Sequence, residues 1–362
     1  MELRIKGVLS PKASGSITIT ENGNYDVVDV ANAVVEVKPS GTIEIAENGE
    51  HDVANYAVAN VNVVDEESAI NLETLQILVD GWATNSNFRL FQGKNIKSIP
   101  KSIDFSNVTQ TNYFSSCNML EEVEDINVKN VKSLQYWFGN CQNLKKIINV
   151  DCSSATTLSS FAYNCPQLVE VSLKNANNVT EMRSAFQNSS ALEKVDLDGD
   201  LINDMQQAFY GCKKLKEVRF KKAKPSILQS CFVNCDSLKT VELNLINASN
   251  VSSFLRVEYL ENLYLYNIKI DLEIATSAGY GNHLTKESLI HTIQELIDTG
   301  SSKTLTMKST NINKIANVYV KVISEAPDEN GNVKLPFEVC ESTDEGAMLI
   351  TNYVTLKNWA LA

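Results

Sequence analysis

The sequence predicts an α/β solenoid, a stack of short coils that each contribute one strand to a common sheet. A column of small residues recurs along the chain at steps of 24, 24, 24, 23 and 23 residues. Its members are Cys117, Cys141, Cys165, Ser189, Cys212 and Cys235. Nearly every member has an aromatic residue three positions before it, Leu three after it, and Val or Ile six after it. A fixed period of roughly 20 to 50 residues indicates copies of one unit that bury their apolar faces against one another.

Length and charge exclude several classes of protein. The chain has 362 residues, enough for a repeat array with attached domains, and its net charge of −12 argues against general binding of nucleic acid through phosphates. No stretch approaches the roughly 20 apolar residues of a membrane span. The first residues contain no apolar signal core, and the last ones (TLKNWALA) contain no apolar anchor. We therefore expect no nucleic-acid partner, no membrane insertion and no export by the usual secretory route.

Residues 1–64 contain a second, unrelated repeat. The segment ITITENGNYDV at 17–27 returns 26 residues later as IEIAENGEHDV at 43–53, and each copy runs into alternating apolar positions. Alternation interrupted by Asn-Gly predicts two strands joined by a tight turn. A module of about 25 residues is too small to be stable alone. We expect these small β modules to pack on each other or on other copies of the chain, for attachment or oligomerisation.

Residues 65–83 are predicted to form a helix that caps the start of the array, because their apolar residues lie on one helical face. The solenoid itself is predicted at 84–268, with about eight coils of 22–24 residues. Each coil should be a short parallel strand plus a short helix or helical turn. In the third coil the phenylalanine stands at position 161, one place before the aromatic position of the repeat. We therefore expect the packing to differ locally in this coil.

Residues 269–362 are predicted to form an α/β C-terminal cap, because an open end of a repeat array would expose its core. The clearest helix lies at 283–300, with Thr285 as N-cap and Gly300 as its end. A strand is expected at 304–308, followed by a less regular region that extends to Trp359.

The eight cysteines are predicted to be free thiols. Five of them occupy the repeat column, where Ser189 substitutes without a change in its neighbours. Free cysteine is among the most buried residue types, which fits such a column. The chain has no pair of Cys-x-x-Cys motifs, so the pattern does not indicate zinc.

One column of the predicted sheet alternates in charge from coil to coil. Its members are Glu122, Lys146, Glu170, Lys194 and Glu217, followed by Thr240 and Asn262. Opposite charges on adjacent strands are mildly stabilising, so we interpret the column as a structural ladder on the exposed face of the sheet rather than as a binding site.

Two groups of residues are candidates for binding. The first is Tyr259, Tyr264 and Tyr266, which are either exposed contact residues or packed under the C-terminal cap. The second is a basic patch between residues 212 and 225, which could meet an anionic polymer such as a phosphate-rich glycan or simply be a solvated face. The candidate binding residues of this patch are Lys216, Arg219, Lys221 and Lys222.

No catalytic or metal-binding motif is complete. His283, Glu287, His291 and Glu295 recur every four residues, but the apolar stripe of the helix lies elsewhere, so the last three should face solvent and His283 precedes the helix. The acidic run at 196–200 has its glycine misplaced for a calcium loop. His51, the third histidine, occupies the place of Tyr25 in the twin module. We therefore expect no metal, no cofactor and no enzymatic activity.

The segments NVTEMRSAFQNSSALEKVDL, AFYGCKKLKEV and CFVNCDSLKTVEL resemble the BspA-like leucine-rich repeats of bacterial surface proteins, over about half of the chain. The two N-terminal repeats look like short modules common in tail and fibre proteins of phages of Gram-positive bacteria. The segment LTKESLIHTIQELIDTGSSKTLTM, with a late LKNWALA, is similar to the cap of leucine-rich arrays in such phage proteins. That cap usually ends in Lys-Gly-Trp, where this chain has Lys357, Asn358 and Trp359.

This resemblance implies a non-enzymatic, receptor-binding protein of a phage tail or baseplate, made in the bacterial cytoplasm and carried on the virion. Its partners would be a glycan or protein of the host cell surface and other tail or baseplate proteins. We expect a homo-oligomer, with a trimer as the first guess. The alternative is a bacterial cell-surface adhesin. A third hypothesis, an enzyme that degrades surface polysaccharide, would need paired carboxylates in a groove.

Overall fold

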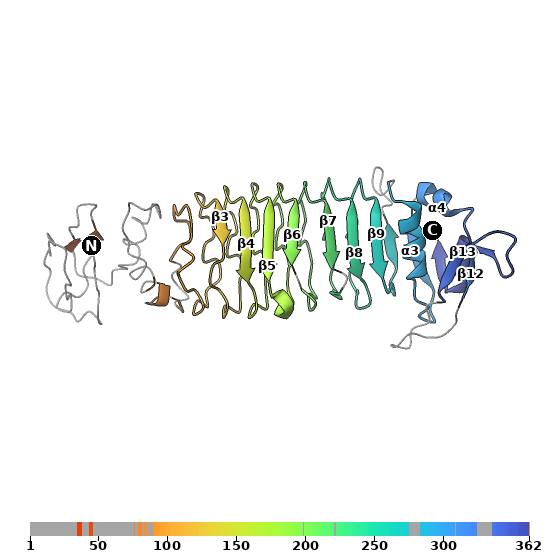
Figure 1. Cartoon of the computed structure of the whole chain (residues 1–362), viewed down its shortest axis with the longest axis horizontal. Coiled ribbons are helices and arrows are strands. Elements are labelled where there is room, and N and C mark those ends of the chain that lie inside the picture. The colour runs from red at the N-terminus through yellow and green to blue at the C-terminus, as the bar shows by residue number, and fades with distance from the viewer. Residues whose placement is uncertain are drawn as a thin grey trace.

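The computed structural model describes strands at residues 35–37 and 43–45, the helical residues 76 and 79–81, residues 83–84, and most of the chain from 90 to 361. Within that last range the description omits residues 198, 221, 275–282, 308 and 324–334. The coils stack along the long axis of the molecule, with their strands side by side on one face (Figure 1). The predicted fold class, a leucine-rich-repeat solenoid of α/β character, is confirmed.

Between residues 122 and 266 each coil contributes one strand, and neighbouring strands pair in parallel within each of two sheets. The first sheet has the order β3 (Glu122–Glu124), β4 (Lys146–Asp151), β5 (Glu170–Lys174) and β6 (Lys194–Leu197). The second has the order β7 (Glu217–Phe220), β8 (Thr240–Asn244) and β9 (Asn262–Tyr266). The inward positions of the strands alternate with exposed ones, and this alternation places Val, Ile and Leu in the core.

The rest of each coil consists of turns rather than α-helix. Successive turns close with bonds such as Ala185 N–H to the Met182 carbonyl, and the only helix of this region in the described residues is the 3-10 helix η1 (Ala176–Asn178). Left-handed residues recur in every one of these coils, for example at Asn140, Asn164 and Asn188 with φ of 62°, 55° and 63°. Because a right-handed helix cannot continue through such residues, the helical-turn alternative holds and the helix alternative does not.

The column of small residues lies in the core and ties each coil to the one before it. The Cys141 thiol donates to the Phe114 carbonyl at 3.2 Å, and the Cys212 thiol donates to the Phe186 carbonyl at 3.1 Å. Ser189 makes the same bond to the Ala162 carbonyl at 2.7 Å, which explains why serine can stand in the column. Burial raises the pKa of the Cys141 thiol to about 12. The prediction of free, buried thiols is confirmed for this column.

Substitutions at Cys141 should separate hydrogen bonding from packing. Cys141→Ser keeps a donor for the Phe114 carbonyl and should leave the thermal midpoint close to that of the wild type. Cys141→Val fills similar space but removes this donor, and the carbonyl keeps only the Cys117 amide at 3.3 Å, so the loss should be that of one hydrogen bond, about 0.5–1.5 kcal/mol. Thermal unfolding followed by circular dichroism measures both, and equal midpoints for the two variants would show that the bond adds nothing.

An aromatic spine runs beside this column. Phe186 stacks on Phe209 at a centroid distance of 5.6 Å, and Phe209 stacks on Phe232 at 5.8 Å. In the third coil the displaced ring of Phe161 meets Phe138 and Phe186 edge-on instead, at 5.3 and 6.4 Å. The expected local repacking is therefore confirmed.

Near the N-terminus, β1 (Val35–Val37) pairs antiparallel with β2 (Ile43–Ile45). This pairing joins a strand of the first small repeat to a strand of the second. The remainder of the predicted β modules at 1–64, and most of the capping helix predicted at 65–83, lie outside the described residues.

The C-terminal cap contains more regular structure than expected. Strands β10 (Leu272–Ile274), β11 (Lys303–Met307) and β15 (Trp359–Leu361) form a parallel sheet. Strands β13 (Phe337–Cys340), β12 (Tyr319–Val322) and β14 (Met348–Leu349) form an antiparallel one. Helices α3 (Lys286–Gln294), α4 (Ser309–Ile315) and α5 (Ile350–Leu356) accompany these sheets. The region predicted to be less regular is thus an ordered α/β cap.

Helix α3 begins as predicted and ends earlier than predicted. The Thr285 hydroxyl accepts a hydrogen bond from the Ser288 amide, as an N-cap should. The helix ends at Gln294, so Gly300 does not terminate it. The buried ammonium of Lys357 accounts for the difference, because it donates to the carbonyls of Gln294 and Leu296 at 3.0 and 2.7 Å and so caps the end of the helix.

The Lys-Asn-Trp ending closes the cap at the same point. Asn358 has a φ of 58°, in the left-handed region that glycine favours and that asparagine tolerates. Its side-chain amide donates to the Asp298 carboxylate at 2.9 Å, and the Trp359 indole donates to the Ile297 carbonyl at 3.0 Å. Asparagine can therefore replace the usual glycine without loss of the turn.

Candidate binding cleft

The sheet of the solenoid is interrupted once among its described strands, between β6 and β7. The ladders run from β3 to β6 and from β7 to β9, and no backbone hydrogen bond between described residues joins the two sets. Figure 1 shows the wider space between β6 and β7. The step from Lys194 to Glu217 is 23 residues, the same as the step from Glu217 to Thr240, where the strands do pair. Coil length is therefore not the cause of the interruption.

The other side of the solenoid stays continuous at this point. The bridge between Glu181 and Asp204 is followed by one between Asp204 and Ile227. The Phe186 amide donates to the Ala208 carbonyl at 2.9 Å, across the same pair of coils. The two coils thus open on the sheet face while they remain bonded on the turn face.

Hydrogen bonds to the outer neighbours identify the backbone groups that face the opening. The Lys194 amide donates to Val169 in the preceding coil, so the groups of Val195 and Leu197 face β7, because successive residues of a strand point to opposite sides. The Lys216 carbonyl accepts from Thr240 in the following coil, so the groups of Glu217 and Arg219 face β6 by the same rule. No hydrogen bond from these facing groups to a described residue is present. Two rows of backbone donors and acceptors therefore face each other across the opening.

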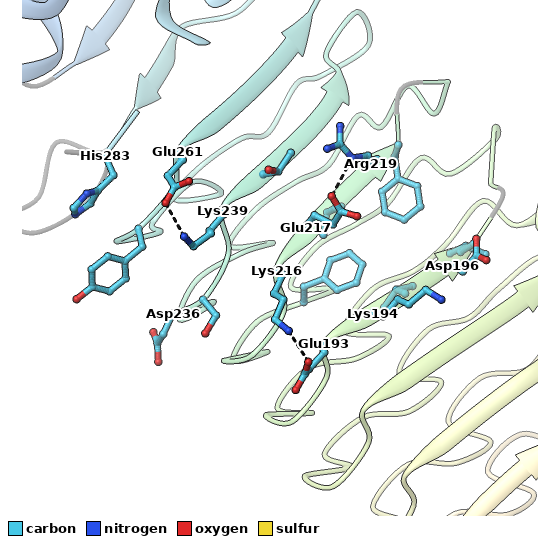
Figure 2. Close-up of a pocket in the computed structure, with 18 residues that line it drawn as sticks. Glu193, Lys194, Asp196, Lys216, Glu217, Arg219, Asp236, Lys239, Glu261 and His283 are labelled. Carbon is cyan, nitrogen blue, oxygen red and sulfur yellow. Dashed lines mark hydrogen bonds and ion pairs between the residues drawn. The ribbon is translucent and has the colours of Figure 1, made fainter. Parts of the chain in front are cut away.

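The opening is part of a cavity of about 1400 Å³. Figure 2 shows charged side chains on its rim, among them Lys194 and Asp196 from β6 and Glu217 and Arg219 from β7. Apolar side chains of the core also line it: Val195, Leu197, Phe209, Val218 and Phe220. Val195 is only half-buried, whereas Val171 and Val241, in the same position of other coils, are 0 % exposed. The cavity therefore reaches the hydrophobic core.

Phe220 is the physical reason we assign to the opening. It occupies the inward position that is Leu173 in β5 and Leu243 in β8. A phenyl ring needs more room than a Leu side chain, and this ring stacks on Phe209 of the aromatic spine with the centroids 6.4 Å apart. It remains 8 % exposed at the cavity, whereas Leu243 is 0 % exposed.

Three cations of the basic patch form ion pairs on the rim. Lys216 lies 2.7 Å from the Glu193 carboxylate, and Lys222 lies 3.7 Å from Asp200. Arg219 contacts both Glu217 at 3.2 Å and Glu242 at 3.3 Å. The hydrogen bond from Lys216 lowers the pKa of Glu193. These pairs favour the solvated-face interpretation of the patch over a site for a phosphate-rich polymer.

The ion pairs of the rim predict that binding through the sheet face around the opening is insensitive to salt. We expect binding to whole cells to change by less than about threefold between about 50 and about 500 mM salt, because ligands that neutralise free cations are the ones that salt displaces. Sedimentation of labelled protein with cells at each salt concentration measures this. A fall of about tenfold or more would contradict the assignment.

The charge ladder holds up to the opening and stops there. Lys194 pairs with Glu170 at 3.0 Å and Lys146 lies 3.8 Å from Glu122, in the register predicted from the sequence. Glu217, the fifth member, does not face Lys194 in a ladder and pairs with Arg219 of its own strand. The ladder is therefore structural over the four strands β3 to β6. The prediction that Glu217 continues it is wrong.

The tyrosine candidates divide into one exposed and two packed residues. Tyr264 and Tyr266 contact the His291 ring of α3 at 5.5 and 5.0 Å, as the packing alternative predicted. The Tyr266 hydroxyl donates to Glu242 at 3.1 Å, and burial followed by this bond raises the pKa of Tyr266 to about 12. Tyr259 is 45 % exposed and lies 5.3 Å from the His283 ring. Tyr259 is therefore exposed, whereas Tyr264 and Tyr266 are half-buried.

The structure brings most of the candidate residues to one face. Lys216, Arg219 and Tyr259 line the large cavity. Arg219 also lines a smaller one of about 350 Å³ with Tyr264 and Tyr266. Lys222 lies in the coil of the opening, where it pairs with Asp200, and Lys221 lies outside the described residues.

The expected solvent exposure of the helical histidine motif is partly wrong. Glu287 is exposed, but His291 is half-buried against the two tyrosines and Glu295 accepts a hydrogen bond from the Asn267 amide at 3.1 Å. The reason is that α3 packs across the end of β9. Within the described residues, no group of three His, Cys, Asp or Glu side chains is placed to hold a metal ion.

The opening itself was not predicted from the sequence. The repeat spacing is unchanged across it, and the alternation of apolar residues in β6 and β7 is intact. The one sequence signal is Phe220, a ring in a column that otherwise holds Leu in the neighbouring strands.

Comparison with known proteins agrees with the repeat. Residues 182–298 match a family described as BspA type Leucine rich repeat region (6 copies). The second part of the array, from residue 182, is therefore similar to BspA-type leucine-rich repeats. Residues 84–199 match a second family, described as Mycoplasma protein of unknown function, DUF285. No curated protein matches the chain.

Two solved structures are similar to about half of this chain. A leucine rich cell surface protein from Faecalibacterium prausnitzii A2-165 is 15% identical, with a TM-score of 0.25 over 49% of this chain and 71% of that one. A leucine-rich repeat protein from Bacteroides ovatus ATCC 8483 is 15% identical, with a TM-score of 0.20 over 50% of this chain and 68% of that one. In the part of the chain that the structure describes, no helix is long and apolar enough to cross a membrane.

Proposed function

We propose that this BspA-like protein is a non-enzymatic recognition protein that binds a bacterial cell surface through the sheet face around the β6–β7 opening. The opening is the observation that carries the proposal. It exposes part of Val195 and leaves two strand edges unpaired, in a solenoid whose other described strands pair with their neighbours. Unpaired strand edges and exposed apolar atoms are liabilities unless a partner covers them.

The charges around the opening support binding rather than hydrolysis. A polysaccharide hydrolase needs one carboxylic acid whose pKa is raised and a second carboxylate near it. Glu193 on the rim has its pKa lowered instead, by Lys216. The enzyme hypothesis therefore ranks last.

Two biological settings fit the proposal. In the first, the chain is part of a phage tail or baseplate, and its N-terminal repeats attach it to the virion or to sister chains. The resemblance of those repeats to modules of phage tail proteins supports this setting. In the second, the chain is an adhesin of a bacterial cell surface, which suits BspA-like repeats equally well.

Binding of labelled protein to a panel of intact Gram-positive cells tests the recognition role. Asp196 lies on β6 at the rim of the cavity, and Glu124 has the corresponding exposed position on β3. We expect Asp196→Trp to lower cell binding at least tenfold and Glu124→Trp to leave it unchanged. Failure of the wild type to bind any cell type would overturn the proposal, and equal binding by both variants would remove the cleft face from it.

Two further measurements distinguish the settings and the enzyme. Detection of the chain by mass spectrometry in purified virions would favour the phage tail, and its release by protease from the surface of intact producing cells would favour the adhesin. Release of reducing sugar from cell-wall glycan would contradict the non-enzymatic role.

A further inference from the structure

We propose that the opening between β6 and β7 accepts an extended polypeptide segment of a partner protein, which adds a strand between the two. The inference rests on the proposed recognition function and names the chemical class of its partner. The opening is not a flat apolar patch, since both of its walls are strand edges with the same direction and the same register as their outer neighbours.

The backbone groups at the opening have the geometry that a strand requires. Val195 and Leu197 on one wall, and Glu217 and Arg219 on the other, point their amides and carbonyls into the gap. Along each wall these groups repeat every second residue, about 6.6 Å apart. An extended polypeptide presents its own amides and carbonyls at that repeat on both of its edges, so one inserted strand can bond to both walls.

The cavity is large enough for such a segment. A strand is about 4.8 Å wide, about 10 Å thick and about 3.3 Å long per residue, so four residues need roughly 600 Å³. The whole cavity has about 1400 Å³, and the gap between β6 and β7 is one part of it, because the lining also extends to Lys239 and Tyr259. Four residues are also the length of each wall, β6 and β7.

The side chains of the walls define the composition of the segment. Residues of the inserted strand that point inward would lie between Val195 and Val218 or between Leu197 and Phe220, so they should be apolar. Those that point outward would each lie between one positive and one negative neighbour. These flanking pairs are Lys194 with Glu217, and Asp196 with Arg219. The segment should therefore alternate apolar residues with uncharged polar ones.

Immobilised hexapeptides that alternate Val, Ile or Leu with Thr, Ser or Asn are the probes for this site. We expect the full-length protein to bind at least one of them saturably, and the same peptide with its alternate amides N-methylated to lose at least tenfold in affinity. Absence of binding to every member of the set, or equal affinity for the methylated peptide, would overturn the proposal.

Position 219 offers a matched pair of variants. Arg219→Ala removes the side chain and keeps the amide that faces the gap, whereas Arg219→Pro removes both, at an edge position where proline is tolerated. We expect the alanine variant to bind the selected peptide within threefold of the wild type and the proline variant to bind at least tenfold more weakly. Circular dichroism reports whether the proline variant is folded, and equal peptide affinity of the two folded variants would overturn the proposal.

Hydrogen exchange of the wild type keeps the test decisive if the proline variant does not fold. Bound peptide should slow exchange of the Val195, Leu197, Glu217 and Arg219 amides at least tenfold, and unchanged rates with peptide bound would overturn the strand geometry. A neutral oligosaccharide, cellohexaose, that displaces the peptide and protects the same amides would assign the cleft to glycans instead. Peptide binding without any cell binding would overturn the proposed function and leave the peptide site standing, and cell binding without peptide binding would do the reverse.

Discussion

Lys357→Met should lower the free energy of unfolding of the C-terminal cap by about 2–5 kcal/mol. The Lys357 side chain is 0 % exposed, and its ammonium donates to the carbonyls of Gln294 and Leu296. It also lies 4.9 Å from the centre of the Tyr353 ring. Methionine keeps the apolar stem but leaves both carbonyls without this donor, and each buried unpaired group costs about 1–3 kcal/mol.

Lys286→Met is the matched control, because Lys286 is exposed on the first turn of the same helix. Changes at such surface positions are usually within about 0.5 kcal/mol. Urea unfolding combined with limited proteolysis of the cap measures both variants. If the two lose the same stability, Lys357 does not hold the end of α3.

Phe209→Ala should cost about 3–5 kcal/mol, the usual loss when a buried phenyl ring is removed. Phe209 is 0 % exposed and contacts the rings of Phe186, Phe220 and Phe232. Its carbonyl also accepts from the Cys235 thiol at 3.0 Å, so the coil on each side depends on its position. The loss should be accompanied by faster proteolysis around the β6–β7 opening, because Phe209 forms part of the cavity lining.

Tyr259→Ala is the control for this substitution, since it removes an aromatic ring from the same cavity at an exposed position. It should change stability by less than about 0.5 kcal/mol. Thermal unfolding of both variants gives the comparison. Equal midpoints would mean that the aromatic spine does not hold the coils together.

The sequence predicts the features of this fold that repeat. A ring, a small donor, Leu and Val recur in each coil because every coil must bury the same face against its neighbours. The thiol column, the aromatic spine and the register of the charge ladder follow from that repetition. Serine can replace cysteine at position 189 because its hydroxyl makes the same kind of bond, to the Ala162 carbonyl.

Features that depend on one residue, or on residues distant in the sequence, were not predictable in the same way. The end of α3 is determined by Lys357, which follows Gln294 by 63 positions. Some partners of the basic patch lie in other coils, as Glu193 does for Lys216. The opening depends on Phe220 within an otherwise regular pattern, and the packed position of Tyr266 depends on how α3 crosses the end of the array.

Hydrogen exchange of the free protein, resolved to single amides, tests the opening of the sheet most directly. Val195 and Val171 hold the same position in adjacent coils, and only the Val171 amide faces a paired strand. We predict that the amides of Val195 and Leu197 exchange at least about 100-fold faster than those of Val171 and Val241. Equal protection of all four amides would show a sheet closed from β3 to β9 and would contradict the account.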